Sequence, residues 1–382
     1  MKYIGVDIHK DCCVATILDE AGNKLGYVEF DNTRAEWLRF IHKYLKGKCK
    51  VAMEATTFSM AVYDLLEEHG IDVVVSNPSK TRIIAESSTK NDRLDSETIA
   101  QLLRTNYLPL SYIPPKEIRN IRMLLRHCKT LTHDIVQVKN RIHAIIHRNQ
   151  LKHKFSDLFG KSGREFLRTV DLPQNERLQL DSLLRQLEFL EEEKEYMISK
   201  VAKLAEKNED VKLLMTIPGI SYYSAMIIVS EIADITRFKD YRKLASYAGL
   251  VPRLKESSNT RIFGHIKKDC NTMLKSILVE VTHVAVQYPG KIRAKYLRIK
   301  ARRGNKIAII AAARYLLSII YCMLKNREPY RYQNPELTQN KIKKMERKVL
   351  LAKNDPSQNP RPSAIEDDRT TPLRARPQRL EV

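Results

Sequence analysis

Short apolar runs separated by polar turns dominate the first part of the chain. Five of these runs have the length and the enrichment in β-branched and aromatic residues that strands prefer: residues 2–8, 11–18, 25–30, 49–54 and 71–76. Between the third and fourth runs, apolar residues recur at helical spacing, and two further helices are expected at 58–68 and from about Asp95 to Thr105. The pattern therefore predicts an α/β domain with the element order β-β-β-α-β-α-β-α.

Beyond Pro114-Pro115 the apolar positions follow helical periods over longer stretches. Residues 117–149 form one predicted helix with an apolar face and a cationic face. Residues 178–207 have leucines at heptad-like spacing, which is typical of a coiled coil whose partner is either the same chain or a second subunit. Two more helices are expected within 270–325. From about residue 354 the chain lacks apolar periodicity and is expected to be disordered.

These changes of pattern divide the chain into four predicted parts. A length of 382 residues is large for a single core, so several domains are expected. The parts are an α/β domain at 1–112, a basic helix and coiled-coil linker or oligomerisation region at 113–210, a C-terminal helical domain at 211–330 and a basic, disordered tail at 331–382. The two prolines at 114–115 form the linker after the first part.

The chain has a strong excess of positive charge. Its 67 lysine and arginine residues exceed 45 acidic ones, which gives a formal net charge of +22. Such a chain is expected to bind polyanions through phosphate contacts. The longest apolar stretch, Ile307 to Leu324, is interrupted by Arg314, so we expect a buried helix there and no membrane span. The six cysteines are scattered without a C-x-x-C pair, which favours reduced thiols in a cytoplasmic protein.

Four carboxylates have positions that indicate a chemical function. Asp7 ends the first predicted strand, Glu54 ends the fourth, and Asp92 and Asp95 open the last helix of the domain. The element order and the placement of the acids both favour a ribonuclease-H-like fold, which gathers metal-binding acids from these elements. Converging carboxylates repel each other unless cations neutralise them, and oxygen-only ligands suit Mg²⁺ or Mn²⁺. Two such ions about 3.5–4 Å apart are the usual arrangement for breaking and joining phosphodiesters.

Basic residues in several regions are candidates for contacts with nucleic acid. The cationic face of the helix at 117–149 suits backbone binding, and an ordinary solvated face is the alternative. The turn Ile217-Pro218-Gly219-Ile220 resembles a helix-hairpin-helix, in which backbone amides approach a phosphate closely. The stretch 252–275 is polar and basic. The candidates are Lys90, Arg122, Arg126, Lys129, Lys139, Arg141, Pro218, Gly219, Arg253, Arg261, Lys267 and Lys268.

Over residues 2–325 the chain resembles the DEDD transposases of bacterial and archaeal insertion sequences. That family includes bridge-RNA-guided serine recombinases and Piv-type DNA invertases. The matching segments of the first domain are Ile4-Gly5-Val6-Asp7, Met53-Glu54-Ala55-Thr56, Asn77-Pro78 and Lys90-Asn91-Asp92-Arg93-Leu94-Asp95. Those of the C-terminal domain are Ile217-Pro218-Gly219-Ile220, Ala248-Gly249-Leu250-Val251-Pro252 and Glu256-Ser257. The resemblance implies a ribonuclease-H-like catalytic domain and a C-terminal transposase domain.

The resemblance also implies an essential serine, and the matching residue is Ser257. The family has a glycine after this serine, whereas this chain has Ser258, which leaves a rival nucleophile. The family mechanism implies attack of the serine on a DNA phosphodiester, a covalent phosphoserine link and strand exchange through a Holliday junction. Metals at the four carboxylates would polarise the phosphate and stabilise the leaving oxygen. No His-Asp partner for the serine is evident in the sequence, so activation by the metal site is expected.

The partners that the resemblance implies are target and donor DNA, a noncoding bridge RNA that pairs with both, and further copies of the chain as dimers that assemble into tetramers. Two other function classes stay open. A metal-dependent nuclease or junction resolvase would use the acids without the serine. A nucleic-acid-binding protein without catalysis would use neither, and the intact set of four acids argues against it.

Overall fold

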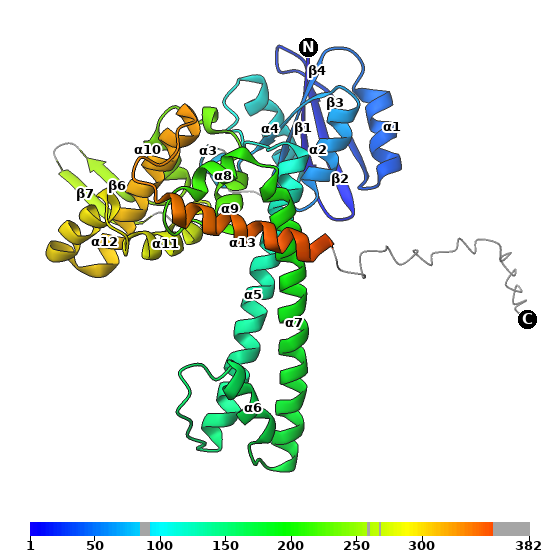
Figure 1. Cartoon of the computed structure of the whole chain (residues 1–382). Helices are drawn as coiled ribbons and strands as arrows, with labels where there is room; N and C mark the ends of the chain where they lie inside the picture. The colour runs from blue at the N-terminus through cyan, green and yellow to red at the C-terminus, as the bar shows by residue number, and fades with distance from the viewer. Residues whose placement is uncertain (85–91, 258–259, 267–268, 354–382) are drawn as a thin grey trace, which may run out of the picture. The chain divides into compact units, whose positions relative to one another are not determined.

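The computed structural model describes residues 1–84, 92–257, 260–266 and 269–353. The chain forms two compact units, Met1–Pro115 and Lys116–Val382 (Figure 1). The first unit is built around a mixed sheet, and the second consists mainly of helices. This organisation confirms the predicted α/β region followed by a mostly helical one.

A five-stranded mixed sheet forms the centre of the first unit. Its strands are β1 (Lys2–Ile8), β2 (Cys12–Leu18), β3 (Lys24–Asp31), β4 (Cys49–Glu54) and β5 (Asp72–Ser76), in the order β3-β2-β1-β4-β5. β2 pairs antiparallel with both β1 and β3, whereas β4 is parallel to both β1 and β5. The five predicted strands are therefore confirmed, with limits that agree closely.

Helices cover both faces of this sheet. They are α1 (Arg34–Tyr44), α2 (Ser59–Glu68) and α4 (Asp92–Arg104), while the short helix α3 (Pro78–Ile84) follows β5. α1 and α2 pack on one face, where Trp37 and Leu66 join a core with alternate residues of the strands. α4 packs on the opposite face, where Ile99 and Leu103 contact Ala52 of β4. α3 is absent from the sequence prediction, and α4 begins before its predicted start.

α4 lies directly on β1 because residue 5 is a glycine. A Cβ atom at Gly5 would lie under 3.0 Å from the backbone oxygen of Ser96 and the backbone nitrogen of Ala100, closer than real Cβ atoms come to other groups. A buried hydrogen bond of 2.8 Å between the hydroxyls of Ser96 and Thr16 joins the same helix to β2. These contacts hold the first turns of α4 against β1, since a close-packed interior cannot absorb an added methyl group freely.

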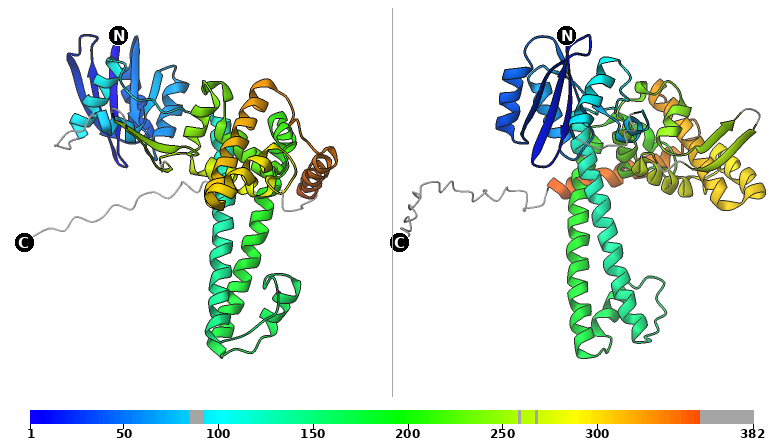
Figure 2. Two further views of the ribbon diagram at one scale, coloured as in Figure 1. Left: turned by 90° about the vertical axis from the view of Figure 1, so that its left-hand side faces the viewer. Right: turned by 180° about the vertical axis from the view of Figure 1, so that it is seen from behind.

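Two long helices of the second unit, α5 (Lys116–Arg148) and α7 (Gln174–Glu206), pack side by side as an antiparallel hairpin (Figures 1 and 2). The short helix α6 (Lys161–Thr169) lies in the connection between them. Leu180, Leu183 and Leu187 of α7 share one core with Ile135 and Ile142 of α5. This part of the leucine seam is thus covered within the chain, whereas Leu204 at its other end is 38% exposed. A contact of the seam with a second subunit stays a prediction.

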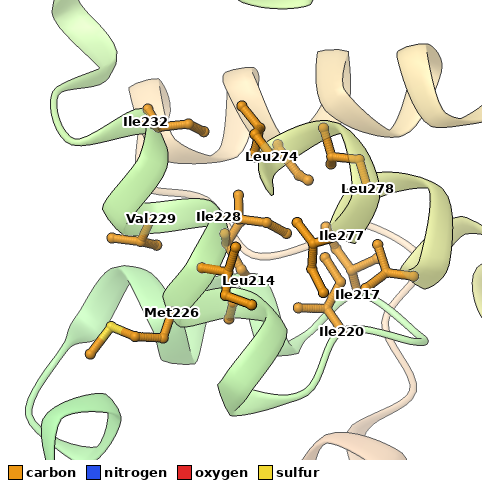
Figure 3. Packing of buried hydrophobic residues seen from close by; sticks show 14 of the residues in the cluster. Leu214, Ile217, Ile220, Met226, Ile228, Val229, Ile232, Leu274, Ile277 and Leu278 are labelled. Atoms are coloured by element: carbon orange, nitrogen blue, oxygen red, sulfur yellow. The ribbon is translucent and has the colours of Figure 1, made fainter. Parts of the chain in front are cut away.

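The remainder of the second unit is a helical body. Its helices are α8 (Glu209–Met215), α9 (Tyr222–Ile232), the 3-10 helix η1 (Ile235–Arg237), α10 (Tyr241–Tyr247), α11 (Thr272–Ala285), α12 (Lys291–Asn326) and α13 (Pro335–Lys353). Leu214 of α8, Ile228 of α9 and Ile277 of α11 meet in its core (Figure 3). α11 and α12 are the two helices predicted within 270–325.

A β-hairpin extends from the helical body (Figures 1 and 2). Its strands are β6 (Pro252–Ser257) and β7 (Thr260–Ile266), which pair antiparallel from Pro252 opposite Ile266 to Ser257 opposite Thr260. In the sequence this stretch is recognisable only as polar and basic. Its charged residues interrupt the alternation by which a strand is recognised.

α12 is the one helix, among those that the structure describes, that is long and apolar enough to cross a membrane. Its backbone kinks at Gly304, where φ is 76°. Beyond the kink, Ala312, Leu316 and Ile320 are buried in the core of the helical body. The prediction of a buried helix in this stretch is therefore confirmed.

α13 corrects the prediction of a disordered tail at 331–382. Met345 and Val349 of this helix are buried in the core of the helical body. The Lys341 ammonium donates hydrogen bonds of 2.7 Å to the carbonyls of Met215 and Ile217, and burial lowers its pKa to about 8. Anchoring by both apolar and polar contacts explains why the segment folds. The prediction for residues 354–382 lies outside the described residues.

Replacing Gly5 by Ala is expected to lower the free energy of unfolding of the first unit by about 1–3 kcal/mol, because the methyl group forces α4 away from β1. Trp37 is the only tryptophan and is buried in this unit, so its fluorescence during urea unfolding measures the effect. Gly26→Ala in β3 is the matched control and is expected to be nearly neutral, since a Cβ there meets only the Ile17 side chain, at 3.8 Å. Equal losses in the free energy of unfolding of both variants would contradict the close contact between Gly5 and α4.

Candidate functional site

β1 and β4 place Asp7 and Glu54 beside each other. The two strands are parallel, with Gly5 opposite Ala52 and Val6 opposite Met53, so Asp7 and Glu54 follow as the next pair. Because side chains alternate along a strand, Asp7 is on the same face as Gly5, and Glu54 is on the same face as Ala52. This is the face of the sheet on which α4 packs.

α4 contributes the third carboxylate, that of Asp95. This residue directly precedes Ser96, whose contacts with β1 and β2 hold the helix in place. Asp95 is exposed, whereas Asp7 is buried with 9% of its surface accessible. Asp92 is the first residue of α4, and its side chain lies outside the described residues.

The carboxylates of Asp7, Glu54 and Asp95 influence one another electrostatically. Burial raises the pKa of Glu54, and the negative charges of Asp7 and Asp95 raise it further. Asp7 has a basic neighbour, since Nε2 of His9 lies 3.2 Å from its Oδ2. His9 was not a sequence candidate, although its position two residues after Asp7 could have indicated it. Three acids from β1, β4 and α4 therefore share one region of the first unit.

The chemistry of this region suits a hard divalent cation. Its donors are carboxylate oxygens, which Mg²⁺ and Mn²⁺ prefer, and a cation would relieve the repulsion that raises the pKa of Glu54. Among the side chains that the structure describes, no three His, Cys, Asp or Glu residues are placed to hold a metal ion. A four-carboxylate site would need Asp92 in addition to the three acids described above.

The candidate nucleophile belongs to the second unit. Ser257 is the last residue of β6 and pairs with Thr260 of β7 at the end of the hairpin. Its side chain lies outside the described residues, as does the whole of Ser258. The backbone thus places the serine next to the connection between two strands, and its role as nucleophile stays a prediction.

Several cations of the predicted basic helix make contacts within the protein. Arg122 donates hydrogen bonds of 2.8 and 3.0 Å to the carbonyls of Ser230 and Glu231 at the end of α9. Arg126 binds the carboxylate of Glu231 at 2.8 Å. Glu231 is buried, and the amide of Asn271 in front of α11 donates to its other oxygen at 2.8 Å. Sequence reasoning missed this buried carboxylate because it lies in an apolar helix that offers no sign of its partners.

The other cations of this helix differ in their surroundings. The Lys129 ammonium donates a hydrogen bond of 2.8 Å to the hydroxyl of Ser276. The Lys139 ammonium lies 3.2 Å from a carboxylate oxygen of Glu191 on α7. Arg141 is exposed. These positions show that the helix stabilises the second unit, and its binding to nucleic acid stays a prediction.

The turn at Pro218 and Gly219 joins α8 to α9, as a helix-hairpin-helix requires. Gly219 has a positive φ of 87°, and a Cβ atom there would lie 2.9 Å from the carbonyl oxygen of Val281 in α11. Close packing on α11 therefore accounts for this glycine without a phosphate. The side chains of Arg253 and Arg261 lie outside the described residues, as do the whole of Lys90, Lys267 and Lys268.

A sheet unit with acids gathered at its strand ends, joined to a helical unit in a strongly basic chain, is typical of enzymes that act on nucleic acid. Comparison with known families narrows this class to transposases. A model of IS110-type DEDD transposases, described as "Transposase", matches residues 4–149, and one described as "Transposase IS116/IS110/IS902 family" matches residues 211–297. The two matches support the assignment of the chain to the IS110/IS116/IS902 family of insertion-sequence transposases.

Individual relatives agree with this assignment over most of their length. The transposase for insertion sequence element IS1111A of Coxiella burnetii is 27% identical over 87% of this chain and 92% of the relative. The transposase for IS1533 of Leptospira borgpetersenii is 23% identical over 86% of this chain and 97% of the relative. The transposase for IS1328 of Yersinia enterocolitica is 24% identical over 75% and 84%. The similarity therefore extends across both units.

In the absence of divalent cations, Glu54→Gln is expected to stabilise the first unit at neutral pH. The raised pKa means that the folded state holds the Glu54 proton more tightly than the unfolded state. The contribution of this proton to the free energy of unfolding is fully present below the ordinary pKa of glutamate. It is lost as the pH rises through the pKa that Glu54 has in the folded state. Glutamine carries no charge, so the advantage of the variant should grow with pH.

Urea unfolding followed by Trp37 fluorescence, in a chelator and at several pH values, measures this difference. Glu29→Gln is the matched control, because Glu29 is exposed on β3. A destabilised Glu54→Gln variant at neutral pH, or an advantage that does not change with pH, would refute the raised pKa of Glu54 in the folded state.

Proposed function

We propose that the chain cleaves and rejoins DNA strands with a divalent-metal site at Asp7, Glu54, Asp92 and Asp95 and with Ser257 as the nucleophile. The observation that supports this most is that Asp7, Glu54 and Asp95 lie near one another. They come from two parallel strands and from the helix packed on them. All three lie within the residues that the DEDD transposase model matches. Oxygen ligands from rigid elements are suited to holding Mg²⁺ or Mn²⁺ in a fixed place.

The chemistry of strand exchange divides between the two units. When bound, a divalent cation would neutralise negative charge on the phosphate that reacts. The hydroxyl oxygen of Ser257 would form a bond to phosphorus and lose its proton, while the bond from phosphorus to a deoxyribose oxygen breaks and that oxygen gains a proton. Attack of a second DNA hydroxyl on the phosphoserine would restore the serine and rejoin the strand. Each step exchanges one phosphate ester for another, so the sequence needs no external energy source.

The excess of positive charge supports polyanionic partners. A net charge of +22 suits a chain that holds target and donor DNA together with a guiding noncoding RNA, through contacts that salt weakens. We propose that homodimers pair into tetramers in this assembly and that it acts in the cytoplasm. Leu180, Leu183 and Leu187 of α7 are covered within the chain, so other surfaces than these leucines would form the contacts between subunits.

A metal-dependent nuclease or junction resolvase is the second candidate. The observation that favours it is that the three described acids lie within Met1–Pro115, whereas Ser257 lies in the other unit. An acidic site of this kind can activate water without a nucleophile from the protein. The identity of the attacking group therefore separates the two functions.

A covalent protein–DNA adduct is the expected product of the serine mechanism. The purified chain is mixed with Mg²⁺, the RNA that flanks its gene and end-labelled DNA with the element's junction, and protein-linked DNA is measured after denaturation. Ser257→Ala is expected to abolish the adduct, because the remaining side chain has no oxygen to bond to phosphorus. Asp7→Asn or a chelator should abolish both the adduct and the cleavage.

Ser258→Ala is the matched control for the neighbouring hydroxyl and is expected to leave the adduct unchanged. Cleaved but unlinked DNA that forms equally with Ser257→Ala would establish the metal-only nuclease instead. Loss of the adduct in Ser258→Ala alone would assign the nucleophile to that residue.

A further inference from the structure

A cavity of about 1000 Å³ opens in the helical body of the second unit. The kink at Gly304 divides α12 into two arms, and both arms line the cavity. The first arm contributes Lys291, Lys295 and Ile299 at four-residue spacing, which places them on one helical face. The segment Glu328–Tyr332, which follows α12, forms another wall. Its size is at the upper end of the range of about 300–1,000 Å³ for small-ligand sites.

Positive charge dominates the polar lining of this cavity. Four cations, Lys291, Lys295, Arg314 and Arg331, line it together with a single carboxylate, Glu328. Within the described part of the chain, none of the four cations forms an ion pair. Arg314 is half-buried on the second arm of α12, in a helix that is otherwise apolar around it. A concave surface with unneutralised cations attracts an anionic group such as a phosphate.

Tyrosine rings provide the second property of the cavity. Tyr241, Tyr315, Tyr330 and Tyr332 all line it. The buried ring of Tyr330 supports that of Tyr332 edge-on, with 5.9 Å between the ring centroids. Tyr332 is 43% exposed and Tyr241 is 37% exposed, so both rings are accessible to a ligand. Accessible rings beside cations are the surfaces on which unpaired bases stack.

The cations and the rings lie close enough to act on one ligand. The Lys291 ammonium lies 5.6 Å from the ring centroid of Tyr332, and the Lys295 ammonium lies 5.3 Å from that of Tyr315. A ligand with a flat ring next to a negative group can therefore contact a tyrosine and a lysine at the same time. An acidic peptide would satisfy the cations but would leave the ring faces unused.

We infer that this cavity binds an unpaired nucleotide of a single-stranded nucleic acid. Its base would stack on the exposed ring of Tyr332, and its phosphate would bind cations of the lining, Lys295 and Arg314 among them. The inference rests on the proposed function only in taking nucleic acid as the substrate of the chain. A base within a duplex could not reach the tyrosine faces, because its own faces are covered by its neighbours. Strand exchange and pairing with a guide RNA both produce such unpaired nucleotides.

The test measures the binding of short fluorescein-labelled oligo(dT) and oligo(U) to the full chain by fluorescence anisotropy. Tyr332→Leu and Arg314→Gln are each expected to weaken binding about fivefold to 100-fold, as the loss of one stacked base does. Arg298→Gln is the matched control for charge, because Arg298 is an exposed residue of α12 outside the cavity lining. Tyr107→Leu in the first unit is the control for an exposed tyrosine. Both controls are expected to bind within about twofold of the unchanged protein.

Loss of binding in the cavity variants but not in the two controls supports the inference. If oligo(dT) binds more tightly than oligo(U), the nucleotide comes from DNA, and if oligo(U) binds more tightly, it comes from RNA. Unchanged binding in Tyr332→Leu would overturn it, as would equal losses in Arg314→Gln and Arg298→Gln. Displacement of the strand by polyglutamate at equal charge would also overturn it. Circular dichroism of each variant separates lost binding from lost folding. Tyr332→Leu is the variant least expected to disturb folding, because Tyr332 is exposed.

The same variants separate this inference from the proposed function. If the cavity variants bind strands normally while the unchanged protein forms the DNA adduct, the cavity inference fails and the proposed function stands. If the cavity variants lose binding but the unchanged protein neither cleaves nor links DNA, the cavity inference stands and the proposed function fails.

Discussion

The close contact of α4 with β1 at Gly5 is the constraint on which the candidate site depends. Strand pairing alone brings Asp7 and Glu54 together, because they follow directly on paired residues of two parallel strands. The third acid belongs to a helix far away in the sequence, and its distance from the sheet is set by the absence of a side chain at residue 5. The hydrogen bond between Ser96 and Thr16 then fixes the helix along β2. Backbone packing thus buries Glu54 beside two other negative charges, and burial first and repulsion second raise its pKa.

A buried charge organises the second unit in a comparable way. The Glu231 carboxylate receives Arg126 and Asn271, while Arg122 binds the backbone at the end of α9. These contacts join α5 to α9 and to the beginning of α11. The guanidinium of Arg122 also lies 3.4 Å from the Glu231 carboxylate with both side chains largely buried, and breaking a buried pair typically costs about 3–5 kcal/mol. Part of the cationic face of α5 therefore serves the fold. Among the residues that the structure describes, cations without an ion pair line the cavity beside α12, together with tyrosines.

Local patterns in the sequence predict the elements of the first unit well, because strands of a sheet and the amphipathic helices that cover it produce clear periods. The positions of the acids at strand ends follow directly from those elements. The function of individual cations cannot be predicted in this way, since Arg122 and Arg141 look alike in the sequence but only the first is bound to α9. α13 was assigned to the tail because its few apolar anchors, such as Met345, lie among charged residues. Its partner Met215 is distant in the sequence, so tertiary contacts decide its fold.

Anomalous diffraction from crystals soaked in Mn²⁺ tests the central claim most directly, because it locates the metal without depending on activity. We expect an anomalous peak bounded by the carboxylates of Asp7, Glu54 and Asp95 on the face of the sheet that α4 covers, with a further ligand from Asp92. Crystals of the Asp7→Asn variant, soaked in the same way, should show no peak at this position or a much weaker one. The proposed metal site would be contradicted if Mn²⁺, at a concentration that supports DNA cleavage, is ordered elsewhere in the chain and absent from these carboxylates.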